Sequence, residues 1–92
     1  SRTRVGAILG SASCTDILLY VRDHPQCLKS DIYWNVSRNA HTRERMDTLC
    51  SEGLLSIEPT GHGNAHVLEL TEKGETVAGL LLRLEEALDP RL

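Results

Sequence analysis

The sequence predicts an α+β fold that is mostly helical, and three observations support this prediction. Apolar residues recur at helical spacing in the first half of the chain, two short apolar runs flank a glycine-rich segment, and a long amphipathic helical pattern follows them. With 92 residues, we expect one domain, 1–92, with a small core. Because the chain has no Phe and 3% aromatic residues, Leu, Ile and Val must build that core.

A short helix or turn and then a full helix open the predicted fold. The first has three apolar residues at helical spacing before Gly10, namely Val5, Ile8 and Leu9. We expect it to contact another subunit. The second covers about 14–23: Ser13 and Asp16 fit a capping box at its start, and His24-Pro25 ends it.

Two further helices follow, joined by a link of about three residues. The first has two turns over 29–36, with one apolar side made of Ile32, Tyr33 and Val36. The second runs over about 40–52. Asn39 can cap it by accepting from a backbone N–H of its first turn, and Gly53 can close it in the left-handed conformation.

The second half of the sequence predicts a β-hairpin and a long helix. Two strands, 54–57 and 66–70, flank a glycine-rich tip over 59–64. Thr71 then caps a helix over Glu72–Leu88, whose first turn carries two glutamates near the positive end of the helix dipole. Pro90 is expected to end the ordered structure.

Three helices, a two-stranded hairpin wing and a long C-terminal helix form the element order of a winged helix-turn-helix. The stretch "ILGSASCTDILLYVRDHP" resembles the opening helix of MarR- and ArsR-like regulators, "RERMDTLCSEGLLSIE" the end of their recognition helix, and "HVLELTEKGETVAGLL" their last wing strand and the helix after it. The resemblance covers about 8–88. In length the chain is closer to small archaeal winged-helix proteins with one long C-terminal helix. These families are mostly DNA-binding transcriptional regulators or chromatin-type proteins, and the resemblance implies that role.

The resemblance also implies that the helix over 39–52 enters the major groove of duplex DNA. The net charge is −3, yet residues 29–45 carry four basic and two acidic groups, whereas 46–92 carry three basic and nine acidic groups. By helical geometry one side of the helix faces the core, namely Thr42, Met46, Leu49, Cys50 and Gly53, and the other faces outward, namely Ala40, His41, Glu44, Asp47 and Thr48.

The expected DNA contacts divide by position. Asn39 and His41 are the expected base readers, and Arg43 reaches a guanine or a phosphate. Contacts to phosphates are expected from Lys29, Ser30, Arg38 and Arg45, and wing-tip contacts from His62 and Asn64.

Two acidic residues on the outward face oppose DNA binding. Glu44 and Asp47 would repel phosphates unless one of them accepts a hydrogen bond from a cytosine amino group. The alternative function is a winged-helix module that binds protein and no DNA. An ordinary solvated helix face is the remaining interpretation.

The sequence predicts neither an enzyme nor a cofactor or metal site. The four histidines are scattered, and no GxGxxG, P-loop or HExxH motif occurs. His62 and His66 would lie about 13 Å apart on one straight strand, too far to share a metal ion unless the tip bends. The three cysteines, Cys14, Cys27 and Cys50, have no CxxC spacing and are expected to be buried free thiols, with a sensing role for Cys27 or Cys50 left open.

The last helix predicts a homodimer. Its apolar stripe consists of Val77, Leu80, Leu81, Leu84 and Leu88, and a helix of about 25 Å is longer than the face of so small a domain. The alternative is a helix packed wholly on its own domain. No apolar run approaches the ~20 residues of a membrane-spanning helix, so we expect no membrane partner and a cytoplasmic protein, associated with the nucleoid if prokaryotic.

Overall fold

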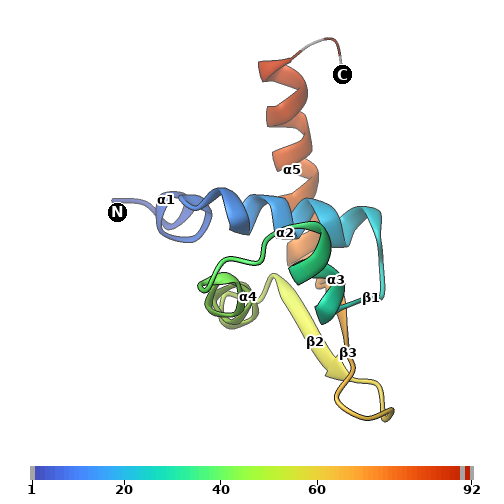
Figure 1. Ribbon diagram of the computed structural model, residues 1–92. Coiled ribbons are helices and arrows are strands. Elements are labelled where there is room, and N and C mark those ends of the chain that lie inside the picture. Colours follow the sequence, from blue (N-terminus) through green and yellow to red (C-terminus); the bar gives the residue numbers. More distant parts are fainter. Residues whose placement is uncertain (1, 90, 92) are drawn as a thin grey trace.

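The computed structural model describes residues 2–89 and 91, and its elements follow the predicted order (Figure 1). The helices are α1 (Arg4–Leu9), α2 (Ala12–Asp23), α3 (Lys29–Asn35), α4 (Thr42–Ser51) and α5 (Glu72–Leu88). The strands are β1 (Cys27–Leu28), β2 (Leu55–Pro59) and β3 (His66–Leu70). The mostly helical α+β architecture is therefore confirmed. Pro90 lies outside the described residues.

The hairpin belongs to a three-stranded antiparallel sheet with the strand order β1-β3-β2. The register places Cys27 of β1 opposite Leu68, and Leu55 of β2 opposite Leu70. The sequence did not predict β1, because two residues are too few to show an alternating pattern. The strand β2 begins one residue later than expected, because the backbone of Leu54 closes α4 instead.

The core lies between α2, α4 and the sheet, and α3 closes it from one side. Its fully buried side chains come from every layer: Ile17, Leu18 and Val21 of α2, Ile32 of α3, Met46 and Leu49 of α4, and Leu68 of β3. Alternation along the hairpin turns Leu55 and Leu68 inward, whereas Glu58 and Glu69 are exposed on the other face. Burying each of these large side chains stabilises the fold by about 1.5–3 kcal/mol.

The expected capping box of α2 is wrong. The helix begins at Ala12 with Ser11 as its N-cap residue, so Ser13 lies inside the first turn. The backbone N–H of Cys14 donates to the carbonyl oxygen of Ser11 at 3.1 Å, which already closes this turn. The pattern from Ser13 to Asp16 therefore has no capping role, although the predicted end at His24 is confirmed.

The link between α3 and α4 has six residues, 36–41, and not about three. Side chains organise it. The buried hydroxyl of Thr42 donates to Ser37 Oγ at 3.0 Å, and the backbone N–H of Asn39 donates to the same oxygen at 3.2 Å. The side-chain oxygen of Asn39 accepts from the backbone N–H of His41 at 2.8 Å. Asn39 thus caps a turn that precedes α4, and the regular helix begins only at Thr42.

The end of α4 is a Schellman motif. Gly53 has a φ of 77°, as predicted, and its N–H donates to the carbonyl of Cys50 at 3.0 Å. The N–H of Leu54 donates to the carbonyl of Leu49 at 2.9 Å, and both leucines are buried. The left-handed residue lets these two bonds satisfy carbonyls that a helix end otherwise leaves free.

The start of α5 is fastened to this helix end. The carbonyl of Leu54 accepts from the backbone N–H of Thr71 at 3.1 Å. The Thr71 hydroxyl donates to the carbonyl of Gly53 and accepts from the N–H of Gly74, so the predicted cap is confirmed. Gly74 lies directly against the Leu54 backbone, where there is no room for a Cβ atom. From this junction α5 extends away from the domain, opposite to the hairpin tip (Figure 1).

We predict that Gly74→Ala destabilises the domain by about 1–3 kcal/mol, because the added Cβ would meet the Leu54 carbonyl oxygen and would lie 2.9 Å from the carbonyl carbon. The matched control is Gly79→Ala in the same helix, where a Cβ has no heavy atom within 4 Å. It should stabilise the domain by about 0.5–1 kcal/mol, because alanine favours a helix interior. Urea unfolding followed by circular dichroism measures both. Equal effects of the two substitutions would contradict the prediction.

Candidate nucleic-acid interface

The helix α4 has a buried and an exposed face, as its sequence predicts, but Gly53, which was expected to face the core, lies beyond the helix end and is exposed. Thr42, Met46 and Leu49 are fully buried, and Cys50 is half-buried. On the opposite side His41, Glu44 and Asp47 are exposed, whereas Thr48 is half-buried. The outer face of α4 is thus free to contact a partner from its first turn onward.

The basic residues of α4 lie on opposite flanks of the helix. Arg43 is exposed, whereas Arg45 is half-buried and close enough to Cys14 of α2 for its charge to act on that thiol. Lys29, the first residue of α3, is also half-buried. Its charge acts on the thiol of Cys50, which lies on the same side of α4 as Arg43. Lys29 and Arg43 therefore lie on one side of the outer face, with Arg45 on the other.

The other predicted contacts outside the hairpin lie on α3 and in the link before α4. Ser30 is exposed on α3, and Arg38 is exposed in the link, with its guanidinium 3.9 Å from the centroid of the Trp34 ring. The Asn39 side chain uses its oxygen in the turn before α4, which leaves its NH₂ group for a partner. The structure therefore places four of the predicted residues, Arg38, Asn39, His41 and Arg43, around the same end of the helix.

Ion pairing separates these cations from some of the other basic residues, although among the residues described Arg2 and Arg83 form no ion pair either. Three arginines elsewhere are paired with carboxylates: Arg4 with Glu52 at 2.7 Å, Arg22 with Asp23 at 3.6 Å, and Arg91 with Asp89 at 3.1 Å. Within the described residues, none of the four predicted cations, Lys29, Arg38, Arg43 and Arg45, forms an ion pair. Their positive charge is left for a partner.

The acidic residues of the outer face are not equivalent. Glu44 lies 3.3 Å from Nδ1 of His41, so a protonated His41 would offset its charge. Both side chains are largely exposed, and such a pair contributes little to stability. Asp47 has no such partner among the described residues, and its charge adds to the burial that raises the pKa of the neighbouring Cys50. Asp47 is therefore the stronger obstacle to a nearby phosphate.

The hairpin supplies polar groups but no cation. His62 and Asn64 are exposed at the tip, as predicted. His66 stands at the start of β3, where its Nδ1 lies 2.8 Å from the carbonyl oxygen of Asn64. Glu58 and Glu69 are exposed on the outer face of the hairpin, which gives it a negative charge that was not predicted from the sequence.

The described residues also form an apolar groove, outside α4. No group of three or more metal-ligating side chains occurs among them, and no described helix is long and apolar enough to cross a membrane. An apolar groove of about 260 Å³ lies between α1 and α5 and is lined by Val5, Ile8, Leu9, Leu54 and Val77, with Arg4 and Lys73 beside them.

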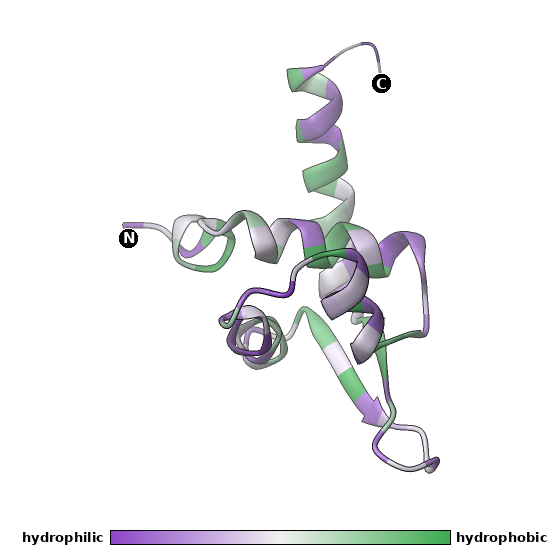
Figure 2. Cartoon of the chain, viewed as in Figure 1, coloured by the Kyte–Doolittle hydropathy of each residue, from purple (hydrophilic) through white to green (hydrophobic). Residues whose placement is uncertain are grey.

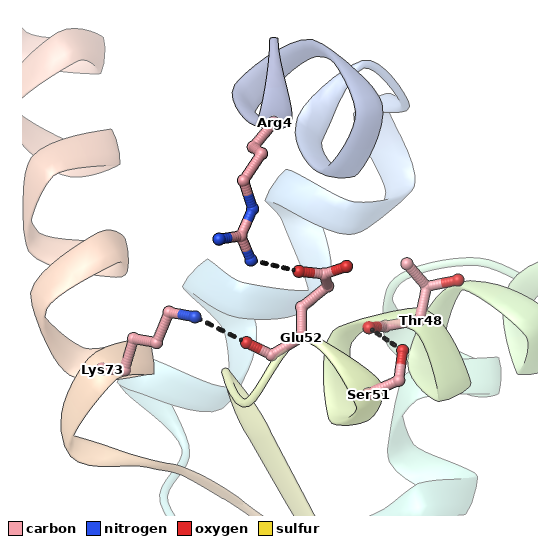
Figure 3. A network of polar contacts seen from close by, with 5 residues as sticks. All are labelled: Arg4, Thr48, Ser51, Glu52 and Lys73. Atoms are coloured by element: carbon pink, nitrogen blue, oxygen red, sulfur yellow. Dashed lines mark hydrogen bonds and ion pairs between the residues drawn. The ribbon is translucent and has the colours of Figure 1, made fainter.

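Two further features were not predicted from the sequence. Trp34 is exposed beneath Arg38, and the spacing of four residues in "WNVSR" was the only available signal. Glu52, next to the C-terminal end of α4, pairs with Arg4, while its carbonyl accepts from Lys73 Nζ at 2.9 Å (Figure 3). These contacts join α1, α4 and α5 and were not visible in any local pattern.

Comparison with solved structures identifies the fold. The chain matches MarR with a TM-score of 0.76 and 20% identity, over 90% of this chain and 60% of MarR. It matches a SlyA-like transcription regulator from Listeria monocytogenes with a TM-score of 0.73 and 16% identity, over 83% of this chain and 52% of that one. A transcriptional regulator homologue from Pyrococcus horikoshii OT3 matches with a TM-score of 0.76 and 20% identity, over 91% and 87% of the two chains.

These matches confirm the MarR-type winged-helix fold, including its long C-terminal helix. The chain spans about half to three fifths of the length of MarR and the Listeria protein, but most of the Pyrococcus protein. No protein-family model matches the sequence, and a search of curated proteins finds no significant match.

Burial is the main influence on the pKa values of the three cysteine thiols. It raises the pKa of each thiol, while Arg45 partly opposes the effect at Cys14 and the acidic neighbours Asp31 and Asp47 add to it at Cys27 and Cys50. A raised pKa leaves less of the reactive thiolate at neutral pH. This arrangement argues against Cys27 or Cys50 as a sensing thiol.

We predict that the folded protein reacts slowly with an aromatic disulfide reagent at pH 7. The rate should rise about tenfold for each pH unit up to pH 9, because a thiol below its pKa gains thiolate in that proportion. Absorbance of the released thiolate measures the rate, and the protein unfolded in urea is the control, in which all three cysteines should react fast. A thiol that reacts equally fast in the folded protein at pH 7 would disprove the prediction.

Proposed function

We propose that this chain is a DNA-binding transcriptional regulator or chromatin-type protein that binds duplex DNA as a dimer through α4. One observation carries the proposal: the exposed first turns of α4 are flanked by basic residues that form no ion pair with an acidic side chain of the described chain. The MarR-type fold supports it, because helix-turn-helix proteins place this helix in the major groove. Its place of action is then the cytoplasm, or the nucleoid in a prokaryote.

Within this proposal each residue has a role. Asn39, through its free NH₂ group, and His41 contact base edges, and exposed Arg43 reaches a guanine or a phosphate. The phosphate contacts are Lys29, Ser30, Arg38 and Arg45, of which half-buried Lys29 and Arg45 have the shortest reach. The wing contributes at most His62 and Asn64, since its outer face is acidic.

The dimer is proposed from the surface of α5. Val77 and Leu81 pack against the core, but three leucines at a spacing of four residues stay exposed: Leu80 at 52%, Leu84 at 59% and Leu88 at 82%. Apolar residues continue to the outer end of this helix (Figure 2), and Val5 of α1 is 68% exposed. A contiguous apolar stripe of this kind is rare on monomers, and a second copy of the chain would cover it.

A protein-binding module without DNA affinity is the second candidate function. The observation that favours it is the acidic outer face of α4, where Glu44 and Asp47 are both exposed. Anisotropy titration with labelled random duplex DNA at low and high salt separates the two functions. A DNA binder shows affinity that falls as salt rises, whereas the protein-binding module shows none at either salt concentration.

We predict that Arg43→Ala with Arg45→Ala weakens DNA binding by a few kcal/mol at most, and lowers the slope of log affinity against log salt by about one unit for each phosphate that the variant no longer binds. The same anisotropy titration measures both quantities. The matched control is Arg22→Ala with Arg91→Ala, which removes the same charge from exposed residues outside the interface and should leave the salt slope unchanged. Equal behaviour of the two double variants would contradict the assigned interface.

We predict a dimer in solution at micromolar concentration, and a monomer for Leu84→Glu with Leu88→Glu, because four glutamates would meet in the apolar contact. Sedimentation equilibrium measures the mass. Gly79→Glu is the control, since it adds a glutamate to another side of α5, where a Cβ on Gly79 has open space. This control should stay dimeric. A single-chain mass for the unaltered protein refutes the dimer, and a dimeric leucine variant refutes this contact.

A further inference from the structure

The most exposed aromatic side chain lies outside the core. Trp34, the only tryptophan of the chain, stands on α3 with 70% of its surface exposed. By helical geometry it shares with Ser30 the side of α3 opposite the fully buried Ile32. Its ring therefore adds little to the packing that holds the helix, and its role must be sought in what it contacts.

That contact is Arg38. The guanidinium carbon lies 3.9 Å from the ring centroid, a distance typical of a cation–π interaction. Arg38 makes no hydrogen bond or ion pair through its side chain with any described residue, so its N–H groups remain free for a partner. The backbone beside it is fixed, because the N–H of Asn39 donates to Ser37 Oγ and the Asn39 side chain accepts from His41.

We propose that Trp34 is a positioning residue, which holds the Arg38 guanidinium beside the first turn of α4 so that it can bind a phosphate of duplex DNA. This inference rests on the proposed function. A guanidinium held over a ring can still present N–H groups to a partner, in the planar arrangement that suits phosphate oxygens. The ring also restricts a long side chain before binding, so less conformational entropy is lost when the phosphate is bound.

A double-mutant cycle tests the inference. Trp34→Leu, Arg38→Ala and the double variant are titrated with labelled random duplex DNA by anisotropy over a range of salt concentrations. Trp34→Leu should weaken binding about two- to fivefold, the loss expected for an exposed cation–π contact. Arg38→Ala should weaken it more and lower the salt slope by about one unit for each chain bound. In the Arg38→Ala background, Trp34→Leu should have no further effect.

Two controls complete the experiment. Trp34→Phe keeps a ring under Arg38 and should restore most of the affinity that Trp34→Leu removes. Lys29→Ala removes a cation from the same helix that is not paired with the ring, so Trp34→Leu should keep its full effect in that background. Thermal unfolding of the Trp34 and Arg38 variants should match that of the unaltered protein, because both side chains are exposed.

The possible failures are distinguishable. If the unaltered protein shows no salt-sensitive affinity for DNA, the proposed function falls and this inference falls with it. If the unaltered protein binds and Trp34→Leu binds equally well, only the positioning role is overturned. The role is also overturned if Trp34→Leu weakens binding as much with Arg38→Ala as without it, since the ring would then contact DNA or another partner directly.

Discussion

The backbone of Leu54 is the constraint on which the arrangement of the helices depends. Its N–H closes α4 by donating to Leu49, and its carbonyl accepts from Thr71 at the start of α5. Both groups of one buried residue are thereby satisfied within the junction, and leaving either unpaired would cost about 1–3 kcal/mol. Gly74 completes the junction, because only a residue without a side chain lets α5 pass so close to this carbonyl.

This junction links the proposed interface to the proposed assembly. It fixes the end of α4, whose first turn carries the predicted DNA contacts, and the start of α5, whose outer half carries the exposed leucines. Arg4 and Lys73 hold the same helix end through Glu52 (Figure 3), so α1 is joined to it as well. In a dimer formed through α5, the distance between the two α4 helices would therefore be set by the geometry of the junction at Leu54.

The sequence predicted the elements that are long, that have periodic apolar residues, or that are capped by a residue next to them in the chain. The bounds of α5 and the left-handed Gly53 follow from such signals, and so does the division of α4 into a buried and an exposed face. The misses concern features with a weak local signal. The strand β1 exists because β3 pairs with it, and the Ser13 pattern failed because the chain turns at Ser11. Trp34 beneath Arg38 and the half-burial of Arg45 depend on how elements meet in space.

The distribution of charge decides how such a domain would hold DNA. The outer face of the hairpin carries Glu58 and Glu69 and its tip carries no Lys or Arg, so the wing has no permanent cation for the minor groove. Four cations without an ion pair, Lys29, Arg38, Arg43 and Arg45, lie instead on α3, the link and α4, where Asp47 opposes them. With so few phosphate contacts in each chain, affinity depends on the position of every cation and on a second chain. The proposed positioning of Arg38 by the Trp34 ring and the proposed dimer through α5 would both compensate for the small number of phosphate contacts.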